Sequence, residues 1–164
     1  KTTDKKQRAY LINHFMDQFK GTVYRQTMFA EFELAMGKMA ESGQALTADA
    51  LCQKYHALNK LYFGPDMVSD DQIALEWARI PHFFYNYYVF QYATGFSAAV
   101  AIANRILKEG APAVADYKKF LSGGCSTDPI SLLKIAGVDM SSPEPVNSAL
   151  ALFGELVDEM EQLV

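Results

Sequence analysis

An uncharged run of twenty-five residues, from Ile80 to Asn104, constrains the fold of this chain more than any other feature. Pro81 stands where a helix can begin, because a proline costs least in the first helical turn. Nothing breaks a helix again before Gly110 and Pro112. The pattern therefore predicts one long helix from about His82 to Glu109.

The two halves of this run differ in chemistry. In the first half, Tyr85, Tyr88 and Tyr92 follow His82 at a spacing that places three phenols on one helical stripe. The second half, residues 98–103, is small and apolar. Small residues let neighbouring helices approach closely, so we predict that this half is buried among other helices.

A run of this length also raises the possibility of a membrane span, since about twenty apolar residues cross a bilayer. Its polar side chains, including those of Asn86, Gln91 and Ser97, would each need a hydrogen-bond partner in the hydrocarbon. We therefore predict a core helix of a water-soluble protein with one end at a polar cleft, and no contact with a membrane.

Composition narrows the class of protein. Half of the 164 residues are hydrophobic and 13% are aromatic, which predicts one folded domain over residues 1–164. The net charge is −4 and the fifteen Lys and Arg residues are scattered, so we predict no nucleic-acid partner. Cys52 and Cys125 lie far apart without metal-ligand spacing, which is typical of reduced thiols in the cytoplasm.

The start of the chain predicts a fragment of a longer protein. The first ten residues are charged and helix-like, lack an initiator Met and contain no apolar region of a signal peptide. We therefore expect a cytoplasmic location.

The rest of the chain also has the pattern of helices separated by turns. Asp4 or Thr3 can cap a first helix that ends at Gly43, Thr47 caps the next, and Ser69 caps a short one. After Gly110, one helix has Pro112 near its start and ends at Gly123, and the next begins at Ser126 or Thr127, has Pro129 in its first turn and ends at Gly137. Residues 141–164 close the chain as an amphipathic helix. Because no segment alternates like a strand, we predict an all-α fold of about seven helices.

Catalytic motifs are absent from the sequence. His14, His56 and His82 are never within four residues of one another, so no zinc-binding histidine pair lies on one helix. Serine-hydrolase and nucleotide-binding motifs are also absent.

His82, Tyr85 and Tyr88 form the one group with chemical promise. Phenols suit a developing oxyanion, because they donate a hydrogen bond while they stay neutral at pH 7. The alternative is a packed aromatic stripe whose hydroxyls bond backbone carbonyls, and spacing alone favours that alternative.

Three blocks in order, at residues 14–33 (HFMDQFKGTVYRQTMFAEFE), 80–99 (IPHFFYNYYVFQYATGFSAA) and 121–140 (LSGGCSTDPISLLKIAGVDM), resemble the C-terminal part of oligoendopeptidase F. These enzymes are zinc metallopeptidases related to thimet oligopeptidase. The resemblance implies a helical zincin-type peptidase with one zinc in a deep cleft. It also implies that the metal ligands lie upstream of this chain, which by itself should bind no metal and be inactive.

The resemblance further implies the site residues. Tyr88, Tyr85 and His82 are the expected catalytic residues, with Tyr88 donating to the oxyanion. His82, Tyr85 and Tyr92 are expected to hold the substrate, a short peptide. The expected partner is the upstream half of the same catalytic domain.

A second hypothesis is a non-catalytic helical module that binds peptides or self-associates. A chain without its partner half would expose apolar helix faces, so a homodimer is a possible state of the fragment.

Overall fold

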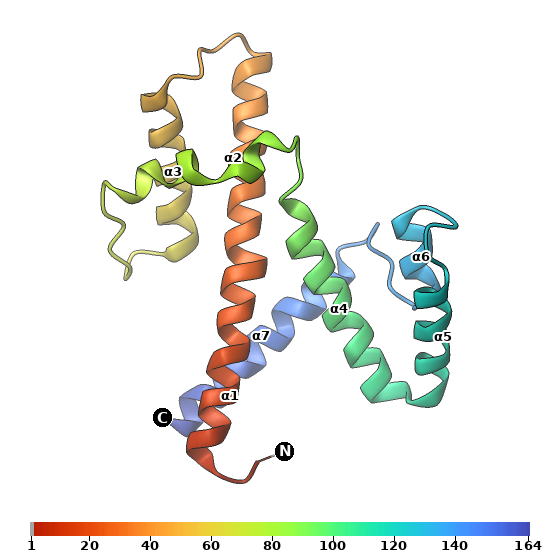
Figure 1. Cartoon of the computed structure of the whole chain (residues 1–164). Coiled ribbons are helices and arrows are strands. Elements are labelled where there is room, and N and C mark those ends of the chain that lie inside the picture. Colours follow the sequence, from red (N-terminus) through yellow and green to blue (C-terminus); the bar gives the residue numbers. More distant parts are fainter. Residues whose placement is uncertain (1) are drawn as a thin grey trace. The chain divides into compact units, whose positions relative to one another are not determined.

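A computed structural model describes residues 2–164, and the described residues contain helices and no strand (Figure 1). Residues 2–164 contain seven α-helices, one π-helical segment and two 3-10 segments, which agrees with the predicted all-α fold. In chain order these are α1 (Lys5–Gln18), the π-helical η1 (Phe19–Tyr24), α2 (Arg25–Glu41), α3 (Ala48–Phe63), the 3-10 segments η2 (Ile73–Arg79) and η3 (Pro81–Phe84), α4 (Phe90–Glu109), α5 (Ala111–Ser122), α6 (Pro129–Ile135) and α7 (Glu144–Leu163).

The chain divides into two compact units. One consists of the N-terminal helix up to Phe19 together with Thr94–Val164, and the other of Lys20–Ala93. The first unit is called the terminal unit below and the second the central unit. Each is described by itself.

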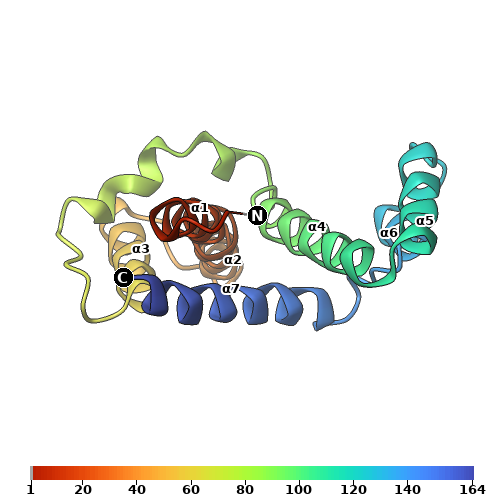
Figure 2. The ribbon, with the colours of Figure 1, turned by 90° about the horizontal axis from the view of Figure 1, so that it is seen from below.

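In the terminal unit, α1 packs against α7; the two helices cross in Figure 1, and Figure 2 shows α1 nearly end-on beside α7. Arg8 on α1 forms a two-pronged ion pair with Glu159 on α7, with N–O distances of 2.6 and 2.7 Å. The buried ring of Phe19 packs edge-on to Phe96 at 4.9 Å between centroids and lies 5.4 Å from Phe153. Aromatic pairs at this spacing add to the stability that burial provides.

Arg105 on α4 links several segments of the terminal unit. Its guanidinium donates to the carbonyl of Ala136 at 2.8 Å and pairs with Asp116 at 2.9 Å and Glu109 at 3.0 Å. Gly137 lies directly against this guanidinium. One side chain thus ties α4 to α5 and to the turn after α6.

In the central unit, α2 packs against α3, and η2 lies across α3 (Figure 1). The core combines aromatic and aliphatic side chains from these elements and from the segment before α4. Its buried members are Met28, Phe29, Phe32, Leu51, Tyr55, Leu58, Ile80 and Val89. Fully burying one such side chain contributes about 1.5–3 kcal/mol to stability.

Helix caps that depend on local sequence follow the prediction in part. Asp4 caps α1 by accepting from the Gln7 amide, and Thr47 caps α3 by accepting from the Ala50 amide. The predicted cap at Ser69 is wrong, because Asp70 accepts from the first amide of η2 and the Ser69 hydroxyl donates to Asn59.

The cap of α6 also differs from the prediction. Asp128, and neither Ser126 nor Thr127, accepts from the Ser131 amide at 2.9 Å. A carboxylate is a strong hydrogen-bond acceptor at a helix start and also interacts favourably with the helix dipole.

The predicted long helix from His82 is wrong at its beginning. Residues 81–84 form η3, Asn86 and Tyr87 adopt positive φ angles of 52° and 59°, and α4 starts only at Phe90. In the small-residue half of the run, Ala98, Val100 and Ile102 are buried as expected, whereas Ala99 and Ala103 are exposed.

Within residues 2–164, no helix combines the length and apolar character that crossing a membrane requires.

Candidate functional site

Four polar aromatic side chains gather between η3 and the first turn of α4. The ring of His82 lies 5.7 Å from Tyr85, 5.9 Å from Tyr88 and 6.0 Å from Tyr92, measured between centroids. Tyr88 in turn lies 5.9 Å from Tyr85 and 5.6 Å from Tyr92. The structure therefore brings together all four residues that the sequence singled out, and they are called the aromatic cluster below.

The backbone that brings these four side chains together is not the continuous helix that the sequence predicted. His82 belongs to η3, Tyr85 and Tyr88 flank a turn of left-handed backbone, and Tyr92 lies on α4. The turn changes the direction of the chain so that Tyr85 and Tyr88 meet edge to face, with an interplanar angle of 88°.

The cluster is open on its outer side. Tyr85 is 59% exposed, and Tyr88 and Tyr92 are each 37% exposed, whereas His82 is half-buried. The alternative interpretation of the sequence, an aromatic stripe packed in the core, does not describe these phenols, because a core position leaves a ring almost without exposed surface.

The hydroxyls of the cluster are linked to one another. The Tyr92 Oη lies 3.4 Å from His82 Nε2. A hydrogen bond with Tyr88 raises the pKa of Tyr92, and partial burial and the nearby phenols raise it further. Tyr92 therefore stays protonated at neutral pH, as a donor must.

Such a cluster can bind an oxygen that carries negative charge. Neutral O–H groups held in place before the reaction can donate to a carbonyl oxygen as it becomes an oxyanion, without the cost of reorganising water. The half-buried imidazole adds a further hydrogen-bonding group beside them.

Two residues of α2 contact the turn that places the cluster, and neither was recognised as functional from the sequence. Glu33 is only 6% exposed, and its Oε1 accepts from the Tyr87 amide at 2.7 Å. Gly37 lies against the Tyr87 hydroxyl. The available signal was a carboxylate in an apolar helical segment, because a buried carboxylate needs a hydrogen-bonding partner.

The other two histidines lie outside the cluster. His14 contacts Gln18 on the same helix at 3.4 Å, and His56 lies 3.0 Å from the Ser69 carbonyl. Across the described part of the chain, no three or more His, Cys, Asp or Glu side chains are grouped as metal ligands. The donors present here therefore do not fit a catalytic zinc.

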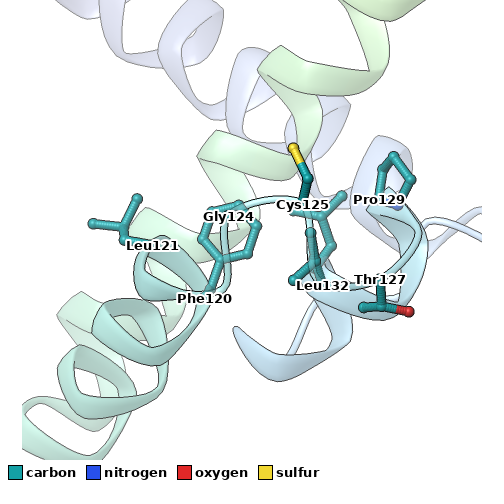
Figure 3. Close-up of a pocket in the computed structure, with 8 residues that line it drawn as sticks. Phe120, Leu121, Gly124, Cys125, Thr127, Pro129 and Leu132 are labelled. Carbon is teal, nitrogen blue, oxygen red and sulfur yellow. The ribbon is translucent and has the colours of Figure 1, made fainter.

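A separate hollow of about 580 Å³ lies in the terminal unit, where α5 meets α6. Figure 3 shows its lining side chains coming from the end of α5, the following loop and the start of α6: Phe120, Leu121, Gly124, Cys125, Thr127, Pro129 and Leu132. Cys125 is an exposed free thiol. The lining is mostly carbon and contains no histidine or carboxylate, so it offers chiefly packing surface, with the Cys125 thiol as an ionisable group.

The fold and the aromatic cluster define an all-helical protein with an exposed set of neutral hydrogen-bond donors. The chain belongs to peptidase family M3, whose model matches residues 1–152. It is 57% identical to oligopeptidase PepF of Bacillus subtilis over 161 residues, which are 98% of this chain and 24% of that protein. It is 42% identical over 163 residues to a chromosomal oligoendopeptidase F of Lactococcus lactis subsp. cremoris, covering 27% of that protein.

A solved structure shares the fold. The crystal structure of oligoendopeptidase-F from Enterococcus faecium matches 99% of this chain with a TM-score of 0.96 and 47% sequence identity. The match covers 31% of that crystallised chain. The chain thus spans about a quarter to a third of the length of these relatives, and the predicted resemblance to oligoendopeptidase F is confirmed.

Proposed function

We propose that this chain is the C-terminal part of the catalytic domain of a zinc-dependent oligoendopeptidase that hydrolyses short peptides. Its membership of peptidase family M3 supports the reaction class, and the names of its relatives support oligopeptides as substrates. The single observation that carries a role for this part is the open cluster of neutral donors around Tyr88.

In this proposal, the cluster binds the substrate backbone and stabilises the transition state. The Tyr88 hydroxyl donates to the oxyanion that forms on the scissile carbonyl. His82 and Tyr85 act beside it as catalytic residues by orienting that carbonyl, and Tyr92 contacts the peptide while its hydrogen bond restrains Tyr88. Oriented donors of this kind act in the transition state more than in the ground state.

The zinc of the proposed enzyme would be held by residues of the upstream part of the domain. The grouping of donors within residues 2–164 does not fit such a metal, so we assign this chain no step through it. We therefore propose that the isolated chain is inactive.

The proposed setting is the cytoplasm, which suits the free thiols of Cys52 and Cys125. The proposed partners are peptide substrates and the upstream half of the same domain, with no nucleic acid or membrane. Both compact units belong, in this proposal, to that one domain.

The test is Tyr88→Phe in the full-length peptidase that contains this chain, assayed with a quenched oligopeptide. Losing one oxyanion donor typically lowers kcat by about 100- to 1000-fold, or about 2.7–4 kcal/mol. Tyr10→Phe is the matched control, because Tyr10 belongs to α1 in the terminal unit and is not a member of the cluster. An unaltered kcat in Tyr88→Phe would reject the assignment and favour a non-catalytic helical module.

A further inference from the structure

We infer that α2 sets the geometry of the aromatic cluster, with Glu33 and Gly37 as positioning residues that act through Tyr87. This inference rests on the proposed peptidase function. It concerns two residues of α2 that contact Tyr87 and are not members of the cluster.

The backbone between Tyr85 and Tyr88 has an unusual conformation. Asn86 and Tyr87 are consecutive residues with φ angles of 52° and 59°. Asparagine adopts this left-handed region more readily than most residues, whereas for a bulky aromatic residue such as Tyr87 it is an outlier. Such backbone persists only where the surrounding structure holds it. Contacts with other residues must therefore hold residues 86 and 87 in this conformation.

A hydrogen bond to Glu33 holds the backbone of this turn. The Glu33 carboxylate is buried on α2 and accepts the Tyr87 amide at 2.7 Å. A hydrogen bond to an ionised group is shorter and stronger than one between neutral groups. Residues 33 and 87 belong to the same compact unit, so this bond is an internal contact of the central unit.

The side chain of Tyr87 packs against Gly37. Gly37 lies one helical turn after Glu33, on the same face of α2. A Cβ at position 37 would overlap the Tyr87 Oη, while the ring carbon Cζ would lie at 3.4 Å. Apart from proline, glycine is the residue that least favours a helix interior. Here its lack of a side chain makes room for the hydroxyl.

One face of α2 thus contacts Tyr87 at both its amide and its hydroxyl. Tyr88 follows Tyr87 directly, and Tyr85 precedes the turn by one residue. A shift of Tyr87 therefore moves the donors of the cluster. Misplacing catalytic groups by about 1 Å can cost about 100-fold in rate.

The decisive experiment is a double-mutant cycle in the full-length peptidase. Gly37→Ala should lower kcat by about 100-fold, because its methyl group displaces the Tyr87 hydroxyl. Tyr87→Phe alone should lower kcat less than Gly37→Ala does, because the hydrogen bond from the residue 87 amide to Glu33 remains. The double variant should recover most of the lost kcat, since the new Cβ then meets the ring carbon at 3.4 Å.

The control is Gly154→Ala on α7, where a new Cβ meets nothing within 4 Å. It should leave kcat unchanged. All variants are assayed well below their unfolding temperatures, so that a fall in kcat reports geometry and not unfolded enzyme. The fall should appear in kcat more than in KM, because the displaced donors act chiefly in the transition state.

A second pair of variants tests Glu33 directly. Glu33→Gln keeps an oxygen that can accept the Tyr87 amide, whereas Glu33→Ala removes it. The Gln variant should be at least about tenfold more active than the Ala variant, since it leaves no unpaired amide. Hydrogen exchange of the Tyr87 amide, which needs no activity, should be faster in Glu33→Ala.

Two results would overturn the inference: a wild-type kcat in Gly37→Ala, or a double variant no more active than Gly37→Ala. If Tyr88→Phe loses activity in the same assay, the proposed function survives that failure. If Tyr88→Phe has no effect, the proposed function itself fails.

Discussion

Glu76 shows how a single buried carboxylate can organise a helical unit. It receives hydrogen bonds from Tyr55 at 2.5 Å and Arg25 at 2.6 Å, and it also pairs with Arg79. Burial alone raises the pKa of Glu76, but the hydrogen bonds from Tyr55 and Arg25 and the two guanidinium charges lower it further than burial raises it. The net effect is a pKa below the usual 4.5.

This lowered pKa predicts that the protein becomes less stable at acidic pH. A carboxyl group with a depressed folded-state pKa stabilises the fold above its unfolded pKa, and that stability is lost as the pH falls through the folded value. The free energy of unfolding of the full-length protein should therefore fall as the pH drops below the usual carboxyl pKa of 4.5. Glu76→Gln should show a smaller drop, measured by urea denaturation at each pH.

The matched control for this prediction is Glu41→Gln, which changes an exposed residue at the end of α2. An acid-induced loss of stability that is as large in Glu76→Gln as in the wild type and the control would contradict the role of Glu76.

At the level of the helices, the sequence predicted part of what depends on neighbouring residues: the caps at Asp4 and Thr47 are as predicted, whereas those at Asp70 and Asp128 were missed. The caps at Asp4 and Thr47 were predictable, because a cap and the amide it accepts lie three residues apart. The start of α4 was not predictable in this way. It depends on Glu33, which binds the amide of a residue fifty-four positions later. Helical spacing predicted that Tyr85, Tyr88 and Tyr92 lie close together, which they do, but it gave the wrong backbone between them.

The turn after α6 gives a prediction at this scale. Gly137 has a φ of 79°, and a Cβ there would lie 2.5–2.9 Å from three atoms of the Arg105 guanidinium. Gly137→Ala should therefore destabilise the fold through both backbone strain, about 1–3 kcal/mol, and displacement of Arg105. Thermal unfolding of the full-length protein measures the loss.

Gly43→Ala separates the two causes. Gly43 has the same φ of 79°, but a Cβ there meets nothing within 4 Å. It should thus show the cost of backbone strain alone. Equal losses of stability in the two variants would mean that the contact with Arg105 adds nothing.

At the scale of the molecule, large apolar side chains remain exposed in both compact units. Leu107 on α4 is 85% exposed, and Leu61 on α3 is 70% exposed. Scattered apolar side chains are normal on protein surfaces, but larger patches mark contacts with a partner. Since the chain spans only 24% of its Bacillus subtilis relative, we propose that the upstream half of the domain covers part of this surface.

This proposal predicts that the isolated chain self-associates. Without the upstream half, burial of the exposed apolar faces can proceed only between copies, and each Å² removed from water contributes about 25 cal/mol. Light scattering on the isolated 164-residue chain should give the mass of a dimer or a larger species, well above 18.3 kDa. Leu107→Lys and Leu61→Lys, which place a charge on these faces, should shift the population towards the monomer, whereas Lys108→Ala on the same helix as Leu107 should not. A monodisperse monomer of the unmodified chain would contradict the prediction, because it would mean that the exposed side chains are too dispersed to form an interface.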